Sequence, residues 1–427
     1  MLSQFILKKI KTKKKSFKGL STIVLFASVL TLSQSHSNFS NEQSQHWMKI
    51  RATDKFERSV IANIGVAIEG QAEDYVIAYG NDYELQKVKA LGWLVASSPM
   101  INAQDFPSKD GEFHNYTELT NVLQELTVKN ADIMAMDSIG KSLEGRDIWH
   151  IRISTDLGKS HEKPAVVFMG GHHAREHLSI DVPLRIAQNL IHEFRSNNPR
   201  VVAMLQGREI HFIPCVNPDG AEFDIANANY KMWRKNRAAN GDGTYGVDLN
   251  RNYGFKWGTG GSSKKTNSDT YMGPQPFSEP ETRAIRDFLL KQQNINILLS
   301  YHTYSELILY PWGHSYDPIS DSRGKQVHEI MAQKMATWNG YTPQQASSLY
   351  IASGDTMDWA YGSEKIISFT FELDPKDGMG GWGFYPGAKV IPEVVRKNTE
   401  PAMYLIEHAD NPYRVINEKN GASESKF

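Results

Sequence analysis

The sequence predicts an α/β fold with a mostly parallel, twisted, mixed sheet and helices on both faces, preceded by a small α+β unit. Two observations lead to this prediction. From about residue 113 onward, short apolar runs typical of buried strands alternate with amphipathic segments typical of helices. Residues with metal-binding and acid–base side chains follow several of these runs. That is the expected placement where a parallel sheet holds its ligand beyond the carboxyl ends of the strands.

The large unit is expected to span residues 113–410. Apolar, partly β-branched runs predict its strands at residues 148–153, 165–169, 209–216, 295–300 and 366–371. Helical periodicity predicts helices at residues 113–126, 178–194 and 278–290. The four residues from Ser278 to Glu281 have the pattern of a capping box, which predicts where the last of these helices begins.

Residues 240–275 form a long region with little periodicity and much Gly, Ser, Asn and Thr. A loop region of this length in a compact domain is usually functional. The sequence leaves open whether calcium supports it. After residue 410 the chain is polar to its end, and residues 411–427 are expected to form a disordered tail.

The segment before the large unit predicts a compact α+β layer at residues 38–98. Strands are expected at residues 47–52, 74–79 and 93–96, and helices at residues 53–68 and 82–91. A unit of this size is too small to be an enzyme by itself, and it contains no cluster of ligand-like residues. Residues 99–112, with Pro99, Pro107, Asp110 and Gly111, read as a linker.

Residues 1–37 have the three-part pattern of a secretory signal peptide. Seven lysines and no acidic residue precede an apolar run at residues 20–32, and small and polar residues follow it. The apolar run is shorter than the roughly 20 residues that span a bilayer, which favours cleavage over an N-terminal membrane anchor. Without a cysteine near the junction, a lipoprotein anchor is excluded. A secreted protein, extracellular or periplasmic, is therefore expected, with no membrane attachment after processing.

The composition is that of an ordinary globular chain of 427 residues, with 40% hydrophobic and 22% charged residues. The formal net charge is −1, and removal of the seven N-terminal lysines leaves −8. This negative balance argues against nucleic acid as a partner of the processed protein. Cys215 is the single cysteine, so no intrachain disulfide can form, and its apolar surroundings favour a buried packing role over a nucleophilic one.

The stretch from Val166 to Leu178 carries the first candidate site residues. His173 and Glu176 stand three apart after the strand at 165–169, and His302 follows the strand at 295–300. Two imidazoles and one carboxylate suit a zinc ion and leave a fourth position open for water. Each residue also has a plain alternative, because H-x-x-E occurs by chance in many proteins and a lone histidine can end a strand.

Glu372 is a candidate general base at the end of the strand at 366–371. Its neighbours Phe369, Phe371 and Leu373 are apolar, and an idle carboxylate would be costly in such surroundings. A carboxylate near a metal site can take the proton of the attacking water. The alternative is an acidic residue at the surface.

Six motifs, in order along the chain, resemble those of the zinc metallocarboxypeptidases, the family of carboxypeptidases A, B and T. The resemblance covers roughly residues 113–409. The motifs are G-H-H-A-R-E at 171–176, M-W-R-K-N at 232–236, G-V-D-L-N-R-N at 246–252, S-Y-H-T-Y-S at 300–305, L-Y-I-A-S-G-D at 349–355 and F-T-F-E-L at 369–373. The sequences Y-I-A-S-G-D and G-F-Y-P are most similar to the bacterial carboxypeptidase T type.

The resemblance implies a secreted zinc metallocarboxypeptidase that hydrolyses the C-terminal bond of peptides and proteins. It implies one zinc ion, held by His173, Glu176 and His302. Glu372 would be the base that activates zinc-bound water and then passes the proton to the leaving amine. Arg234 would stabilise the oxyanion of the tetrahedral intermediate together with the metal.

The resemblance also assigns residues to the substrate and to the metal's surroundings. Asn250, Arg251 and Tyr350 would hold the terminal carboxylate, for which a bidentate arginine is well suited. Arg175 and Tyr304 would line the approach for residues upstream of the cleaved bond. Asp248 would orient a zinc-bound imidazole, that of His173.

The residues after Y-x-x-S-G are implied to form the wall of the pocket for the C-terminal side chain. Met357 stands at the position that separates the A and B types, and it is apolar and adaptable. Asp355 lies two residues before it. These two residues predict a preference for bulky apolar C-terminal residues, with secondary cleavage of Lys and Arg assisted by Asp355.

The family context also implies that the unit at 38–98 is a propeptide and that residues 99–112 are the segment cut on activation. The alternative is a permanent accessory domain. The expected partners are peptides with a free C-terminus and the chain's own propeptide, and a monomer is expected. Two other functions stay open: a peptidase of the same fold that acts on cell-wall peptides, and an inactive binding module.

Overall fold

The computed structural model describes residues 45–64, 66–71, 74–99, 105–376 and 383–418. The chain divides into two compact units, Met1–Pro99 and Met100–Phe427. The expected signal peptide at 1–37 lies outside the described residues. Among the residues that are described, no helix is both long and apolar enough to cross a membrane.

The N-terminal unit is an antiparallel sheet with two helices. Its strands lie in the order β2-β3-β1-β4. Their bounds are β1 (Gln45–Arg51), β2 (Ala67–Gln71), β3 (Tyr75–Asn81) and β4 (Leu94–Pro99), and the helices are α1 (Lys55–Ile64) and α2 (Asp82–Ala90). The core includes Met48, Ile50, Ile61 and Val76. The helix expected at 53–68 is shorter than predicted, because the chain after it forms β2, which pairs with β3.

An eight-stranded mixed sheet forms the centre of the large unit. The strand order is β11-β10-β12-β9-β7-β8-β6-β5. The strands are β5 (Met134–Lys141), β6 (Asp147–Ile153), β7 (Ala165–Met169), β8 (Glu209–Ile213), β9 (Ile295–Thr303), β10 (Leu307–Tyr310), β11 (Thr342–Gln345) and β12 (Ile367–Leu373). The four strands from β12 to β8 are mutually parallel. The predicted α/β architecture is therefore confirmed.

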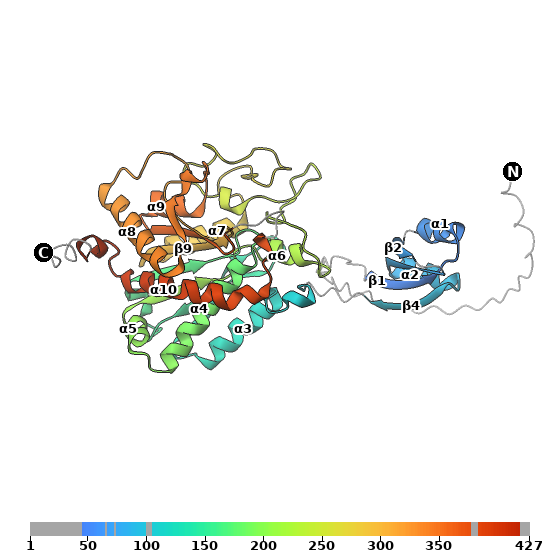
Figure 1. Ribbon diagram of the computed structural model, residues 1–427, viewed down its shortest axis with the longest axis horizontal. Helices are drawn as coiled ribbons and strands as arrows, with labels where there is room; N and C mark the ends of the chain where they lie inside the picture. Colours follow the sequence, from blue (N-terminus) through green and yellow to red (C-terminus); the bar gives the residue numbers. More distant parts are fainter. Residues whose placement is uncertain (1–44, 65, 72–73, 100–104, 377–382, 419–427) are drawn as a thin grey trace, which may run out of the picture. The chain divides into compact units, whose positions relative to one another are not determined.

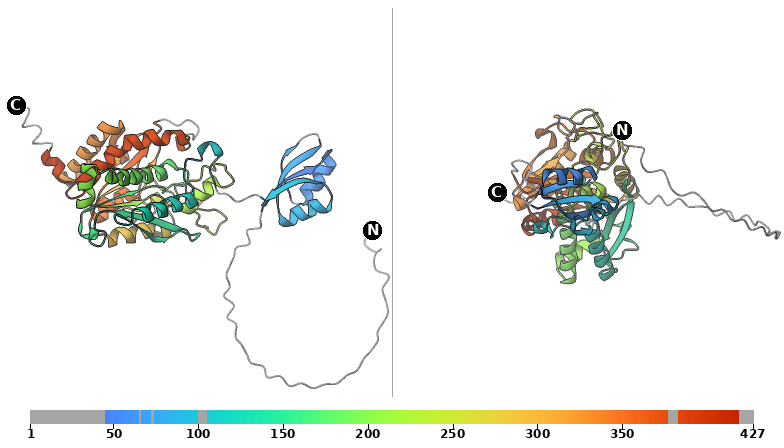
Figure 2. Two further views of the ribbon diagram at one scale, coloured as in Figure 1. Left: turned by 90° about the horizontal axis from the view of Figure 1, so that it is seen from below. Right: turned by 90° about the vertical axis from the view of Figure 1, so that its right-hand side faces the viewer.

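Helices cover both faces of this sheet (Figures 1 and 2). One face packs against α3 (Tyr116–Lys129), α4 (Leu178–Arg195), α5 (Pro199–Gly207), α8 (Ser322–Asn339) and α10 (Ile391–His408). The other packs against α7 (Pro280–Lys291) and α9 (Thr356–Glu364). In β7, Val166 and Phe168 belong to the first core while Val167 and Met169 belong to the second. This alternation is the period of two that a strand covered on both faces requires.

Several boundaries differ from those predicted. The strands β9 and β12 extend to Thr303 and Leu373, so His302 and Glu372 lie within strands rather than after them. The capping box expected at Ser278 is wrong, because α7 begins at Pro280 and its N-cap makes no side-chain bond; Ser278 Oγ instead lies 2.6 Å from Oε1 of Glu279. The strands β5, β10 and β11 were not predicted; β10 and β11 have four residues each, too few to show a period.

The C-terminal segment also departs from the expected disordered tail. Residues 411–418 continue from α10, and Val415 is buried in the core of the large unit. Arg414 bonds the Glu407 carbonyl oxygen at 2.7 Å. Residues 419–427 lie outside the described part of the chain.

A tight turn after β7 carries the chain into the site. A Cβ atom added to Gly170 would lie 1.9 Å from the carbonyl oxygen of Ser179, near the start of α4. Gly171 has a positive φ of 65°, a conformation that favours glycine. The loop from 170 to 177 is therefore held close to the helix that follows it, and this loop contains His173 and Glu176.

We predict that Gly170→Ala destabilises the protein by about 3 kcal/mol, the upper end for overpacking, because backbone rather than a flexible side chain blocks the new methyl group. Gly207→Ala is the matched control. Gly207 ends α5, and its added Cβ would meet nothing within 4 Å. The control should stay within about 1 kcal/mol of the wild type. Equal midpoints for the two variants in urea unfolding would contradict the close approach.

Candidate metal centre and active site

The side chains of the candidate site come from three adjacent parallel strands. His302 lies near the end of β9, and Glu372 lies directly opposite it in β12. His173 and Glu176 follow β7, which pairs with β9 on its other side. The carboxyl ends of these strands meet at one edge of the sheet, so residues more than 120 positions apart come together there.

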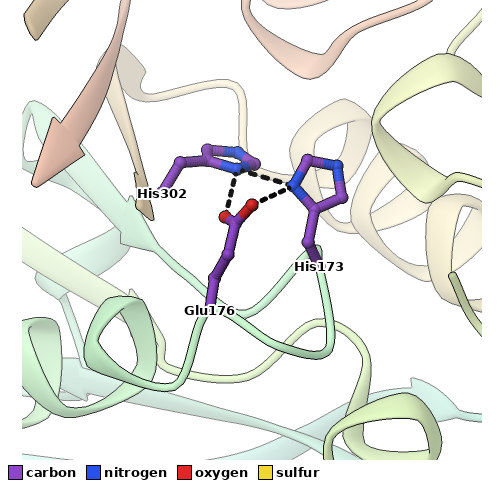
Figure 3. Close-up of side chains that lie close together, drawn as sticks. All are labelled: His173, Glu176 and His302. Carbon is purple, nitrogen blue, oxygen red and sulfur yellow. Dashed lines mark hydrogen bonds and ion pairs between the residues drawn. The ribbon is translucent and has the colours of Figure 1, made fainter. Parts of the chain in front are cut away.

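His173, Glu176 and His302 form a compact, buried group that fits a metal ion. Their ligand atoms all lie within 4.8 Å of one another. Figure 3 shows the three side chains pointing at a common position. Nδ1 of His173 lies 2.8 Å from Oε1 of Glu176 and 3.2 Å from Nδ1 of His302, which lies 2.9 Å from Oε2 of Glu176. All three residues are at most 3% exposed.

The second nitrogen of His173 has its own acceptor, which leaves Nδ1 to face the group. Nε2 lies 3.1 Å from Oδ1 of Asp248, which can accept its hydrogen. Burial, aided by the charge of Arg234, lowers the pKa of His173, which favours the neutral ring that a metal ligand requires.

The charge and spacing of this group suit a cation. Although burial opposes ionisation, the imidazoles of His173 and His302 hold the pKa of Glu176 well below its usual range. The site therefore offers a buried carboxylate and two imidazoles, which is a donor set suited to zinc. Zinc bonds nitrogen at about 2.0–2.1 Å, and a tetrahedral pair of such ligands is about 3.3 Å apart. The separation of 3.2 Å between the two imidazole nitrogens fits a zinc ion.

Arg234 lies beside this group and is linked to it through Asp248. Its Nη2 is 2.9 Å from Oδ2 of Asp248, and its Nη1 is 3.9 Å from Oε1 of Glu176. The carbonyl oxygen of Arg234 accepts a hydrogen bond from the backbone N–H of Ala174. The guanidinium is mostly buried, so its charge acts on the site with little screening by water.

A cavity next to the metal ligands gathers most of the predicted substrate residues. Asn250, Arg251, Tyr350, Asp355, Met357 and Glu372 line it. Arg251 is 3% exposed, whereas Tyr350, at 53%, lies at the rim. Burial raises the pKa of Glu372 to about 7; the nearby carboxylate of Glu176 adds to this, and His302 and Arg234 oppose it.

Asp355 has one bonded and one unbonded carboxyl oxygen. Oδ1 caps α9 by accepting the backbone N–H of Asp358 at 2.8 Å. Oδ2 is buried and has no hydrogen-bond partner. Burial, together with the neighbouring carboxylate of Asp358, raises the pKa of Asp355 to about 8, while Arg251 acts in the opposite direction.

Arg175 and Tyr304 do not line this cavity, and both contact Phe384. The ring centroids of Tyr304 and Phe384 are 4.9 Å apart, edge to face. The guanidinium of Arg175 lies 4.3 Å from the centroid of Phe384. Sequence reasoning missed Phe384 as a site residue, although it belongs to the quoted G-F-Y-P motif. It also missed Leu309 and Thr370, which line the cavity from strands and carry no chemical signal.

Comparisons with known proteins agree with this geometry. A family model described as zinc carboxypeptidase matches residues 119–401. A zinc carboxypeptidase of Saccharothrix mutabilis subsp. capreolus is 36% identical over 343 residues, 78% of this chain and 78% of that protein. Carboxypeptidase B of Astacus astacus is 32% identical over 289 residues, 66% of this chain and 91% of that protein.

Solved structures show the same fold. Bovine thrombin-activatable fibrinolysis inhibitor, in complex with tick carboxypeptidase inhibitor, aligns with a TM-score of 0.62 and 28% identity, covering 70% of this chain and 97% of that chain. Carboxypeptidase A of Helicoverpa armigera aligns with a TM-score of 0.60 and 24% identity, covering 86% and 98%, which shows the fold alone. From the match to the family model and to the curated relatives, the chain belongs to the zinc carboxypeptidase family.

Proposed function

We propose that this zinc carboxypeptidase removes C-terminal residues from peptides with Glu372 as general base, and that it is secreted as an inactive precursor. One observation carries the proposal. Two imidazoles and a carboxylate, all buried, lie with their ligand atoms within 4.8 Å of one another, and the cavity beside this group contains both a carboxyl group and a buried arginine. Zinc, when bound there, supplies a Lewis acid and lowers the pKa of a water molecule.

Arg251 is suited to hold the terminal carboxylate of the peptide. Its Nε donates to the carbonyl oxygen of Gly261 at 3.0 Å, and its Nη1 donates to that of Asn250 at 2.7 Å. These bonds fix the plane of the guanidinium and leave other N–H groups for the ligand. The Asn250 side chain is held in turn by Thr356, whose backbone N–H donates to its Oδ1 at 3.0 Å. Tyr350 lines the same cavity at its rim.

Glu372 and Arg234 would act on the bond that is cleaved. The pKa of Glu372, raised to about 7, suits a group that takes a proton from water and returns it to the leaving amine near neutral pH. The guanidinium of Arg234 is fixed by Asp248, and it would stabilise the negative charge that develops on the peptide oxygen. The two alternatives are less well supported. A binding module needs neither group, and a cell-wall enzyme would need a different pocket around Arg251.

The test of the proposed chemistry is a pair of substitutions with different effects on metal and turnover. His173→Ala should lose zinc and activity together, because two donors remain from a three-residue set. Glu372→Gln should keep one zinc per molecule and lower kcat by about 10²–10⁴-fold, the usual cost of losing a general base. Zinc content and peptide hydrolysis are measured on both variants.

Glu281→Gln is the matched control for Glu372. Glu281 is also buried, and burial raises its pKa to about 7, but it lies in α7 beside Asn236, outside the cavity. The control should turn over like the wild type. Normal turnover by Glu372→Gln, or stoichiometric zinc in His173→Ala, would refute the assignment.

We further propose that residues 38–98 are a propeptide and that activation cuts the chain before Asp105. Phe106 is 4% exposed, and its ring lies 4.8 Å from that of His177. The carboxylate of Asp110, 2% exposed, accepts hydrogen bonds from the Tyr230 hydroxyl at 2.8 Å and the Ala388 N–H at 3.1 Å. These residues are thus part of the large unit, so the cleavable part of the segment at 99–112 lies N-terminal to them. The name of the bovine relative describes that protein as activatable by thrombin.

We predict that a protease recognition sequence placed at residues 100–104 converts a weakly active precursor into an active enzyme when it is cut. The same sequence placed at residues 107–109 is the control. Its cut detaches buried Phe106, so it should lower the melting temperature and give less activity. Equal activity before and after the first cut would identify residues 38–98 as a permanent accessory domain.

The pocket predicts a specificity that changes with pH. Below pH about 8 the carboxyl of Asp355 is neutral and suits an apolar side chain, and above it the unbonded Oδ2 becomes part of an anion. An arginine side chain stays charged throughout this range. The ratio of kcat/KM for C-terminal Arg to that for C-terminal Leu should therefore rise as pH passes through about 8.

Peptides that differ only in the last residue measure this ratio, and the Leu peptide corrects for groups such as Glu372 that act on both substrates. Asp355→Asn should give a low ratio that does not change with pH. A basic preference at all pH values, or an unchanged profile in the variant, would remove Asp355 from the pocket's specificity.

A further inference from the structure

Asp224 is a buried carboxylate outside the cavity that contacts three segments of the chain. It lies in α6 (Pro218–Ile225) and is 0% exposed. Its Oδ1 accepts the backbone N–H of Trp233 at 2.7 Å, and its Oδ2 accepts Nε2–H of His177 at 2.9 Å. The hydroxyl of Tyr385 lies 3.1 and 3.0 Å from the two oxygens and donates to this carboxylate as well.

Each of these three donors is next in sequence to a residue of the active site. The neighbours are Glu176 for His177, Arg234 for Trp233, and Phe384 for Tyr385. Phe384 in turn contacts Arg175 and Tyr304. One carboxylate thus connects the segment of the metal ligands, the loop of Arg234 and the wall formed by Phe384.

The loop of Arg234 is tied to α6 by further bonds. The carbonyl oxygen of Asp224 accepts the N–H of Lys231 at 2.9 Å. The Tyr385 hydroxyl, while donating to Asp224, accepts the N–H of Met232 at 3.1 Å. The Tyr385 ring also stacks on that of Tyr230 with centroids 3.8 Å apart. Because a buried carboxylate is costly to leave unbonded, the three segments are held at fixed distances from one another.

We propose that Asp224 is a positioning residue that sets two parts of the active site together: the Arg234 guanidinium and the Phe384 wall that the peptide passes upstream of its cleaved bond. The proposal rests on the proposed function of Arg234 and of Arg175 with Tyr304. Asp224 touches neither substrate nor metal, and it acts through Trp233 and Tyr385.

Asp219 provides a matched control on the same helix. It is 1% exposed, and its carboxylate accepts the Ser142 hydroxyl, an N–H of Arg146 and the backbone N–H of Glu144, each at 2.7 Å. It is therefore as buried and as well bonded as Asp224, but its partners lie between β5 and β6, and none of them lines the cavity. If the loss of a buried carboxylate has a purely structural effect, Asp224→Asn and Asp219→Asn should show it alike.

The test uses the enzyme after activation, with two substrates that end in the same Phe, an N-acylated dipeptide and an N-acylated tetrapeptide. Steady-state kcat and KM, zinc content and melting temperature are measured for Asp224→Asn, Asp219→Asn and Tyr385→Phe. In Asp224→Asn one oxygen becomes an NH₂ group that faces N–H donors. We expect kcat for the dipeptide to fall by about 10²-fold, as for a misplaced catalytic group, with zinc retained. The tetrapeptide should lose more.

Tyr385→Phe separates the effect on the Phe384 wall from the effect on Arg234. It keeps the bonds to Trp233 and His177, so the ratio of tetrapeptide to dipeptide kcat/KM should fall while dipeptide kcat falls less than in Asp224→Asn. Asp219→Asn should lower the melting temperature and leave both rates and their ratio as in the wild type. A kinetic profile of Asp224→Asn like that of Asp219→Asn, or loss of its zinc, would overturn the proposal.

If Asp224→Asn does not fold, the proposal is tested by the ratio of tetrapeptide to dipeptide kcat/KM in Tyr385→Phe. An unchanged ratio overturns the proposal, and a lowered ratio supports it. A wild-type enzyme that cleaves neither peptide would instead contradict the proposed function, and the two failures are thus distinguishable.

Discussion

The placement of acidic side chains in the buried end of the sheet determines how the rest of the site is built. Glu176, Asp248 and Asp224 are at most 2% exposed, and each is surrounded by donors or cations from several segments. A buried carboxylate without such partners costs several kcal/mol, so each one fixes the segments that satisfy it. Glu176 draws His302 of β9 to the loop after β7, and Asp248 draws Arg234 to His173.

The need of a buried carboxylate for donors or cations also gives the carboxyl groups around the site different protonation behaviour. Glu176 and Asp248 have imidazole or guanidinium neighbours that hold their pKa values well below the usual range, so they stay charged and serve to hold other groups. Glu372 and Asp355 are buried beside other carboxylates and have weaker compensation, which raises their pKa values to about 7 and about 8. Such pKa values suit these two groups for the roles proposed for them, proton exchange and response to a ligand.

The sequence predicted which metal-binding and cavity residues lie together better than it predicted the elements that support them. His173 and Glu176 stand three apart after a recognisable strand, and His302 and Glu372 lie in apolar runs, so local patterns and the family motifs were enough. The capping box at Ser278 failed because Ser278 bonds its neighbour Glu279 and the Asn252 side chain instead. The segment at 411–418 was predicted to be disordered because its polar composition outweighs the few residues, Tyr413, Val415 and Ile416, that pack in or against the core.

Residues that act by connecting segments could not be identified from the sequence, and the reason is physical. Asp224 follows Phe223 in a helix and resembles any surface acid, and its three donors come from residues 9 to 161 positions away. Only the fold shows that they converge on one carboxylate. The proposed catalytic residues can be recognised from their side-chain chemistry and motifs. Asp224, which is proposed to fix their separation, is ordinary in type, and only its surroundings in the fold are unusual. A substitution at such a position alters the distance between Arg234 and the Phe384 wall without removing any group that contacts the substrate.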